Sequence, residues 1–218
     1  MTDHLESPVD PGVGRLFEDF QPGEVIYHPF GRTVTEADNQ TFTLMTQNVA
    51  RIHLDKHFAA RTEFGRPLVN STFTLALVTG QSTIDLSTNV FANLGWDEVR
   101  TPHPVFEGDT IYSRSKVLAA RESTSRPAVG VVTVATEGFN QDGVVVISYR
   151  RTLLVYRRGH QPTATLIHPD EASLPAVTAS ETSVTGRRPR RAGWTRPDGR
   201  AWWWAGGRAD RPAGSGDS

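Results

Sequence analysis

The chain contains no cysteine and no long apolar run, and these two absences exclude several classes of protein. None of its 218 residues is Cys, so disulfide bonds, thiolate nucleophiles and cysteine-bound zinc are all excluded. No apolar run approaches the roughly 20 residues that a membrane-spanning helix needs. The opening residues, MTDHLESPVDPG, lack the basic start and apolar core of a secretion signal. We therefore expect a cytoplasmic protein, with no membrane partner, whose fold rests on an ordinary hydrophobic core.

Net charge is also nearly absent, because 23 Lys and Arg residues balance 24 Asp and Glu residues. The balance hides an acidic body and a basic end: residues 1–186 carry 15 basic and 21 acidic side chains, whereas residues 187–218 carry 8 Arg and 3 Asp. From Arg187 onward there is no Leu, Ile, Val, Phe or Met. Such a segment cannot bury enough apolar area to offset the entropy of ordering it.

Composition predicts one folded domain between two loose ends. Residues 1–12 are polar and contain two Pro, which is typical of a flexible N-terminal arm. The last strand-like run ends at Tyr156, and Pro, Thr, Ala and Ser dominate soon after it. We therefore expect a domain at residues 13–158 and a disordered C-terminal tail at residues 159–218.

The basic and aromatic residues of the tail raise the hypothesis of nucleic-acid binding. Its runs Arg187-Arg188-Pro189-Arg190-Arg191 and Trp202-Trp203-Trp204 combine charge with surfaces for base stacking. A specific module needs a folded platform, however, so we expect no nucleic-acid partner. We interpret the tail as sequence without a selected fold.

Helix patterns dominate the first half of the domain. A strand over Val25–Val34, interrupted by Pro29, precedes Thr35-Glu36-Ala37-Asp38, a capping box that opens a helix through about Met45. A short helix is expected from Asp55 to Arg61. A longer helix should run from Ser71 to about Leu86, and its apolar positions are too frequent for a one-sided surface helix. We expect this helix to be buried on most sides.

The second half reads as strands separated by Pro-rich or Gly-containing turns. The expected strands are Val90–Arg100, Asp109–Ala120, Ala128–Asn140 and Val144–Tyr156. Short connections favour antiparallel neighbours. One buried helix followed by long antiparallel strands predicts an α+β fold in which the sheet curls around the central helix.

The stretch FTLMTQNVARIHLDKHFA resembles the signature of the MaoC-like dehydratases, a hot-dog fold family that includes (R)-specific enoyl-CoA hydratases. That signature begins with an aromatic residue, an aliphatic residue, a small residue and Gly. The run Asp-x-Asn-Pro-aliphatic-His follows, and an Ala or Ser lies six residues after the His. The positions that keep its spacing are Phe42, Met45, Thr46, Asn48, Ile52, His53 and Ala59. The content departs at four positions: Gln47 replaces the Gly, Asn48 the catalytic Asp, and Ala50 and Arg51 the Asn-Pro pair.

The resemblance extends over the order of elements from about residue 14 to 158, and it implies the hot-dog fold. The runs TEFGRPLVNS, ANLGWDEVR, PHPVFEGDT and RESTSRPAVGVV look most like the branch that acts on branched or dicarboxylic acyl-CoAs such as mesaconyl-CoA. The implied activity is reversible addition of water across an α,β-unsaturated acyl-CoA thioester. Coenzyme A would enter only as part of the substrate, with no other cofactor.

The expected catalytic pair is His53 with Asn48. Hydration needs a base for the water and hydrogen-bond donors for the enolate oxygen. In the family an Asp and a His five residues on hold one water between them. An Asn in the Asp position can orient the water but cannot accept its proton, so His53 is the expected base, with Asp55 or Asp38 as alternatives.

Several further residues are expected to bind the substrate. Backbone N–H groups around Asn70, Ser71 and Thr72, at the start of the long helix, suit the enolate oxygen. Arg51 and Arg126 are candidates for a coenzyme A phosphate or a second substrate carboxylate. The last candidates, Gly95 and Trp96, are expected to line the acyl tunnel, the Gly by allowing close approach.

A metal site is not expected. His53 and His57 are four residues apart and could share a helix face, but the intervening Leu54-Asp55-Lys56 lacks the Glu of a zinc protease helix.

Each assignment has a plainer alternative. His53 could be a satisfied structural residue, Asn48 a turn or capping residue, Ser71 only an N-cap, and Arg126 a solvated turn residue. The protein could accordingly be a non-catalytic acyl-CoA-binding hot-dog protein, or a hot-dog thioesterase. Because open sheet edges are a liability unless paired, and because hot-dog relatives usually pair their sheets, we expect a homodimer or a higher homo-oligomer.

Overall fold

The structure is a computed structural model that describes residues 14–162. The chain divides into two units, Met1–Leu166 and Ile167–Ser218, and all described residues lie in the first. The predicted N-terminal arm, residues 1–12, lies outside the described residues, as does all of the predicted tail beyond residue 162.

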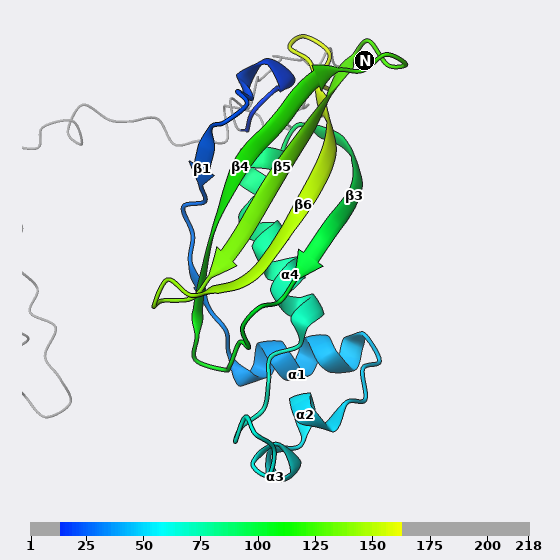
Figure 1. The fold of residues 1–218 in the computed structure, drawn as a ribbon. Helices are drawn as coiled ribbons and strands as arrows, with labels where there is room; N and C mark the ends of the chain where they lie inside the picture. The colour runs from blue at the N-terminus through cyan, green and yellow to red at the C-terminus, as the bar shows by residue number, and fades with distance from the viewer. Residues whose placement is uncertain (1–13, 163–218) are drawn as a thin grey trace, which may run out of the picture. The chain divides into compact units, whose positions relative to one another are not determined.

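One antiparallel sheet and one central helix build the described domain (Figure 1). The strands follow the order β1-β4-β5-β6-β3, with β2 beside β4, and every pair is antiparallel. Figure 1 shows the longest helix, α4, lying along the strands and the shorter helices grouped at its N-terminal end. The predicted α+β arrangement is confirmed. The strands are β1 (Val25–Tyr27), β2 (Arg32–Thr33), β3 (Val90–Arg100), β4 (Thr110–Glu122), β5 (Val129–Phe139) and β6 (Val145–Tyr156).

The first long helix, α1 (Glu36–Met45), begins as its capping box predicts. The hydroxyl of Thr35 accepts from the Asp38 N–H at 3.2 Å, and the Asp38 carboxylate accepts from the Thr35 N–H at 2.9 Å. The Thr35 N–H, with its hydroxyl and the Arg32 guanidinium, holds the pKa of Asp38 below its ordinary value. Asp38 therefore serves as a helix cap.

The short helix expected from Asp55 to Arg61 is present as α3 (Lys56–Ala59). A second short helix that was not predicted, α2 (Arg51–Leu54), precedes it. Asp55 between them is extended, and its carboxylate accepts from the Phe58 N–H at 2.9 Å, which caps α3. Asp55 thus ends one helix and starts the next.

Helix α4 (Ser71–Gln81) ends before the predicted Leu86, and a π-helical turn, η2 (Thr83–Ser87), follows it. Its side chains Phe73, Thr74 and Val78 are buried. On the other side Thr72, Ala76 and Gly80 are exposed. The expectation of burial on most sides is therefore wrong within the described residues: the sheet covers α4 from one side.

Helix and sheet meet most closely at Gly138 of β5. A Cβ placed there would lie 2.6 Å from Val78 Cγ2 and 2.8 Å from Ile147 Cγ2. Both neighbours are fully buried, so neither has space to move aside. The missing side chain at this position allows β5 to lie directly against α4.

A buried polar chain joins the end of β1 to the turn after α4. Nδ1 of His28 lies 2.8 Å from Asp85 Oδ2, its Nε2 lies 2.9 Å from Ser115 Oγ, and that hydroxyl meets Thr136 Oγ1 at 2.8 Å. Ser115, His28 and Asp85 are connected in the same order as the residues of a Ser-His-Asp catalytic triad. Ser115 is completely buried, however, so a substrate cannot reach it, and the chain satisfies buried polar groups instead.

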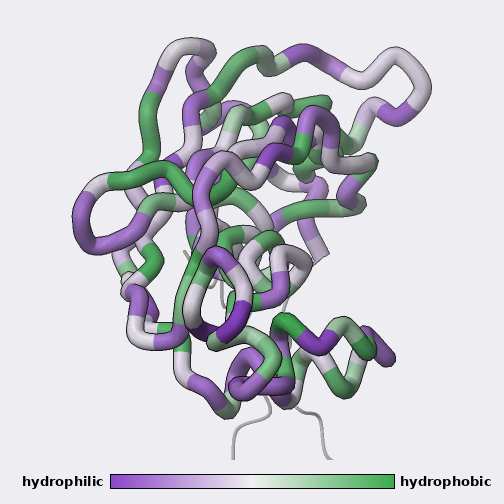
Figure 2. The backbone as a smooth tube through the Cα atoms, turned by 60° about the horizontal axis from the view of Figure 1, so that its bottom comes forward, coloured by the Kyte–Doolittle hydropathy of each residue, from purple (hydrophilic) through white to green (hydrophobic). Residues whose placement is uncertain are grey.

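Hydrophobic residues are spread over all elements, as Figure 2 shows, where hydrophobic and hydrophilic segments alternate along the tube. Within residues 14–162 no helix is both long and apolar enough to cross a membrane.

The close approach at Gly138 generates a stability prediction. We expect Gly138→Ala to lower the free energy of unfolding by about 1–3 kcal/mol, the usual cost of overpacking a core, measured by urea unfolding. Gly95→Ala on β3 is the matched control, because nothing lies within 4 Å of a Cβ there, and it should change stability by less than about 0.5 kcal/mol. Equal stability of the two variants would contradict this account of the packing.

Candidate active site

His53 lies on α2 with its ring fixed in one orientation. Its Nδ1 is 2.9 Å from the carbonyl oxygen of Leu68, an acceptor, so Nδ1 carries the proton and donates. In the neutral ring the lone pair is then on Nε2, for which no hydrogen-bond partner is found in the described part of the chain. The half-buried side chain is therefore prepared to accept a proton at Nε2.

Asn48 lies in the loop between α1 and α2, five positions before His53. Its Oδ1 accepts from the Ala50 N–H at 2.9 Å, and its own N–H donates to the Thr43 carbonyl at 3.0 Å. The turn role considered for Asn48 is thus present, and its Nδ2 amide group stays available as a donor toward a water or a substrate.

The backbone conformation of Gln47, the residue before Asn48, explains why the family signature has Gly at this position. Gln47 has φ +56°, a left-handed conformation that Gly adopts without strain and that often ends a helix. It directly follows the C-cap of α1, Thr46. The backbone here turns as the signature requires although the residue is not Gly.

A buried amide, missed by the sequence analysis, organises this region. Asn39 of α1 is 0% exposed. Its Nδ2 donates to the carbonyl oxygens of Leu68 at 3.0 Å and His53 at 3.3 Å, and its Oδ1 accepts from the Asn70 N–H at 3.0 Å. One side chain therefore ties α1 to the catalytic helix, to the carbonyl that orients His53, and to the N-cap of α4. The sequence signal that could have located Asn39 is its spacing of four residues before Thr43. This spacing places both side chains on one face of α1, the face that the structure buries.

The N-terminus of α4 offers one free donor of the three proposed from the sequence. The Asn70 N–H is taken by Asn39, and the Thr72 N–H donates to Asn70 Oδ1 at 3.0 Å. For the Ser71 N–H, no acceptor is found among residues 14–162. The positive end of the helix dipole adds to this donor. Ser71 is therefore the position at which an oxyanion would bind, and Asn70 is the N-cap.

Asp55 and Arg51 bind each other. The Arg51 guanidinium donates to the Asp55 carboxylate at 2.7 Å and lies 4.8 Å from the Phe58 ring. The backbone N–H of Phe58, followed by Arg51, holds the pKa of Asp55 below its ordinary value. Both alternative bases, Asp55 and Asp38, are thus engaged as caps, and His53 is the one proposed base without such a role. Arg51 already has a carboxylate partner within the chain.

The structure does not bring Trp96 and Arg126 to His53. Trp96 is on β3, with its ring 5.6 Å from the buried Arg151 guanidinium. Arg126 is exposed in the turn before β5, 5.0 Å from the Phe91 ring. No atom of the described residues lies within 4 Å of a Cβ placed at Gly95, so its place in an acyl tunnel stays a prediction. Substrate binding by Trp96 and Arg126 stays a prediction.

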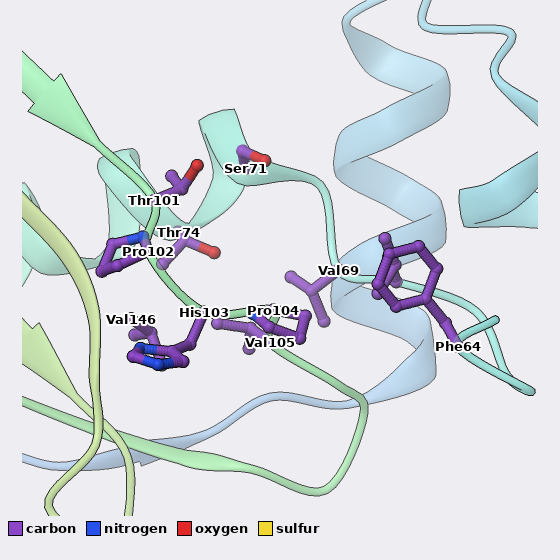
Figure 3. Close-up of a pocket in the computed structure, with 11 residues that line it drawn as sticks. Phe64, Val69, Ser71, Thr74, Thr101, Pro102, His103, Pro104, Val105 and Val146 are labelled. Carbon is purple, nitrogen blue, oxygen red and sulfur yellow. The ribbon is translucent and has the colours of Figure 1, made fainter.

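A cavity of about 240 Å³ adjoins the N-terminus of α4 (Figure 3). It shares Leu68 and Ser71 with the surroundings described above, although neither His53 nor Asn48 lines it. Among the described residues, no group of three or more His, Cys, Asp or Glu side chains could hold a metal ion. Within residues 14–162, the start of α4 thus combines a free Ser71 N–H with an adjoining cavity, and the preceding Leu68 carbonyl orients the His53 ring.

Comparison with known proteins finds a family model and several relatives similar to this chain. The sequence model of a family described as mesaconyl-CoA hydratase matches residues 4–187. The mesaconyl-CoA hydratase of Cereibacter sphaeroides is 37% identical over 146 residues, which cover 67% of this chain and 42% of that protein. The solved structure of a MaoC domain dehydratase from Chloroflexus aurantiacus is 33% identical, with a TM-score of 0.64, covering 72% of this chain and 45% of that one.

A third likeness concerns the fold alone. A Mycobacterium tuberculosis protein described as having a double hotdog fold is 24% identical, with a TM-score of 0.62, and the match covers 78% of this chain and 54% of that one. The predicted hot-dog fold is confirmed. The present chain spans less than half the length of the two relatives named above.

The Asn39 network generates a second stability prediction. We expect Asn39→Ala to lower the free energy of unfolding by about 1–3 kcal/mol, because it leaves the buried Asn70 N–H without its acceptor. Gln40→Ala is the control: its amide binds Glu36 at the surface, so we expect a change below about 0.5 kcal/mol. Thermal unfolding of the two variants side by side measures both. If Asn39→Ala lost no more stability than Gln40→Ala, the hydrogen bonds of Asn39 would not stabilise the fold as described.

Proposed function

This chain belongs to the mesaconyl-CoA hydratase family of MaoC-like hot-dog proteins, and from that premise we propose that it adds water reversibly to an α,β-unsaturated acyl-CoA. The substrate we propose is a branched or dicarboxylic acyl-CoA such as mesaconyl-CoA, the compound in the name of its relative. The observation that carries the proposal is the orientation of His53, whose Nδ1 is held by the Leu68 carbonyl and whose Nε2 is left for a substrate water.

In the proposed hydration, Nε2 of His53 takes a proton from water while the water oxygen bonds to the β-carbon. The Asn48 amide group donates a hydrogen bond that orients this water, since an amide cannot take its proton. The electron pair of the double bond moves toward the thioester oxygen. His53 then returns its proton to the α-carbon, so the elements of one water are added. Dehydration is the reverse of these steps.

The developing charge on the thioester oxygen needs a donor that is already in place. The Ser71 N–H supplies it at the positive end of α4. Asn39 fixes the position of this donor relative to His53, because it binds both the Leu68 carbonyl and the Asn70 N–H. The addition of water changes no net oxidation state, so the proposed reaction needs no redox cofactor. The cytoplasmic location stays a prediction.

Incubation of the purified protein with crotonyl-CoA and with mesaconyl-CoA tests the proposal. We expect the absorbance of the conjugated thioester to fall without release of free thiol. His53→Ala should lower kcat by about 100-fold or more, the contribution of a positioned general base. His57→Ala is the matched control, because this exposed histidine on α3 has no role in the mechanism.

The same assay separates the alternative functions. Release of free thiol would indicate a thioesterase, and binding without turnover would indicate an acyl-CoA-binding protein. If the chain binds the thioester without turnover, the variant Asn48→Asp restores the carboxylate of the family signature. Hydration by this variant would show that the Asn at position 48 is the cause of the missing activity. Unchanged turnover of His53→Ala would remove this imidazole from the mechanism.

We also propose that two copies of the chain form a homodimer through β3. In the described sheet, β3 has β6 as its single neighbour, which leaves its other side as a free edge. Its residues Phe91, Leu94, Trp96 and Val99 are exposed. An unpaired edge that is also apolar favours pairing with another chain. The match to half of a double hotdog protein supports a second copy as the missing half.

Sedimentation of the purified chain measures this association. We expect a species of twice 24.0 kDa, and we expect Leu94→Lys on β3 to shift it toward the monomer, because the charge would be buried against the partner. Leu118→Lys on β4 is the control, since β4 lies between two strands of the sheet. A monomeric wild-type chain at micromolar concentration would be inconsistent with the proposed dimer.

A further inference from the structure

The cavity at the start of α4 has a mixed lining that suits a short, polar-ended acyl group. Valines at positions 69, 105 and 146 contribute apolar walls, and Ser71, Thr74 and Thr101 contribute hydroxyl groups. Figure 3 shows Ser71 and Thr74 on the helix, with the segment 101–105 facing them. The volume, about 240 Å³, lies below the roughly 300–1,000 Å³ of pockets for drug-sized ligands. A long alkyl chain does not fit this space.

Thr74 carries a hydroxyl that no other group of the described residues binds. The residue is 3% exposed, and its oxygen is not among the fully buried side-chain atoms that lack a partner within residues 14–162. Figure 3 shows this oxygen directed into the space between the helix and the opposite segment. The hydroxyl is therefore open to the cavity, where a ligand can bind it.

His103 stands in the opposite wall with one ring nitrogen already bound. Its Nδ1 lies 2.8 Å from the carbonyl oxygen of Val145, so Nδ1 donates and only Nε2 remains for a ligand. A protonated ring donates from Nε2 to an anion. His103 and the hydroxyl-bearing Thr74 and Thr101 all line the same cavity.

We propose that this cavity binds the free carboxylate of a short dicarboxylic acyl-CoA, with His103 and Thr74 as specificity-determining residues. The inference rests on the proposed hydratase function, because it takes the thioester oxygen to lie at the Ser71 N–H. Ser71 and Thr74 are three residues apart on α4, so their Cβ atoms are about 5–6 Å apart on one face. That span suits a short unsaturated acyl group that joins a thioester at one end to a carboxylate at the other.

Neither arginine expected from the sequence lines this cavity. Arg51 is bound to Asp55, and Arg126 lies in the turn before β5. Hydroxyls and one imidazole bind a carboxylate by directed hydrogen bonds, and the apolar walls accommodate the carbon atoms between the two ends.

Binding of unreactive thioesters tests the proposal independently of catalysis. Succinyl-CoA carries the free carboxylate and butyryl-CoA lacks it. We expect wild-type protein to bind succinyl-CoA about 10-fold or more tightly than butyryl-CoA, as a hydrogen bond to a charged group would give. His103→Leu and the isosteric Thr74→Val should each remove most of this difference. His57→Leu, in an exposed histidine outside the cavity, should retain it.

The outcomes separate this inference from the proposed function. If wild type binds both thioesters equally, or if His103→Leu and Thr74→Val weaken both equally, the carboxylate site is wrong even where hydration is observed. If the succinyl-CoA preference is present and depends on His103 and Thr74 while no enoyl thioester is hydrated, the site is supported and the hydratase function fails. Thermal unfolding of each variant verifies that a lost preference is not a lost fold.

Discussion

The amide of Asn39 is the contact on which the rest of the site depends. From one buried position on α1 it donates to the carbonyl oxygens of Leu68 and His53 and accepts from the Asn70 N–H. The site requires a side chain with both donors and an acceptor, because two carbonyls and an N–H from two segments, α2 and residues 68–70, converge on this position. The orientation of His53 and the start of α4 are consequently fixed by the same side chain.

The substitution of Asn for Asp at position 48 changes how the proton has to move. A pair of ionisable groups can divide deprotonation and protonation, whereas in the proposed mechanism the imidazole of His53 does both, because an amide at position 48 cannot accept a proton. The oriented Nε2 of His53 and the free Ser71 N–H are consistent with such a single-base site. The exposed face of α4 and the free edge of β3 in the described sheet are surfaces that the proposed second copy would cover.

Local patterns in the sequence predicted most elements of the domain, for identifiable reasons. The capping box at Thr35 and the strand over Val90–Arg100 were both located correctly, because caps and β-rich runs act within a few residues. The short helix α2 was not predicted, and Asp55, interpreted as the first residue of the next helix, caps α3 from an extended backbone. The exposed face of α4 was also missed, because apolar frequency does not say what covers a helix.

The sequence by itself determined the order of elements, the family spacing around His53, and the absence of a proton acceptor at position 48. Only the tertiary structure decided which donors at α4 stay free, that both alternative carboxylates serve as caps, and that Thr74 and His103 face one cavity. The physical reason is that chain spacing fixes contacts within a helical turn or a strand, where periodicity governs geometry. A buried hydrogen bond between Asn39 and Asn70, by contrast, depends on how two helices pack, and that depends on the whole sheet beneath them.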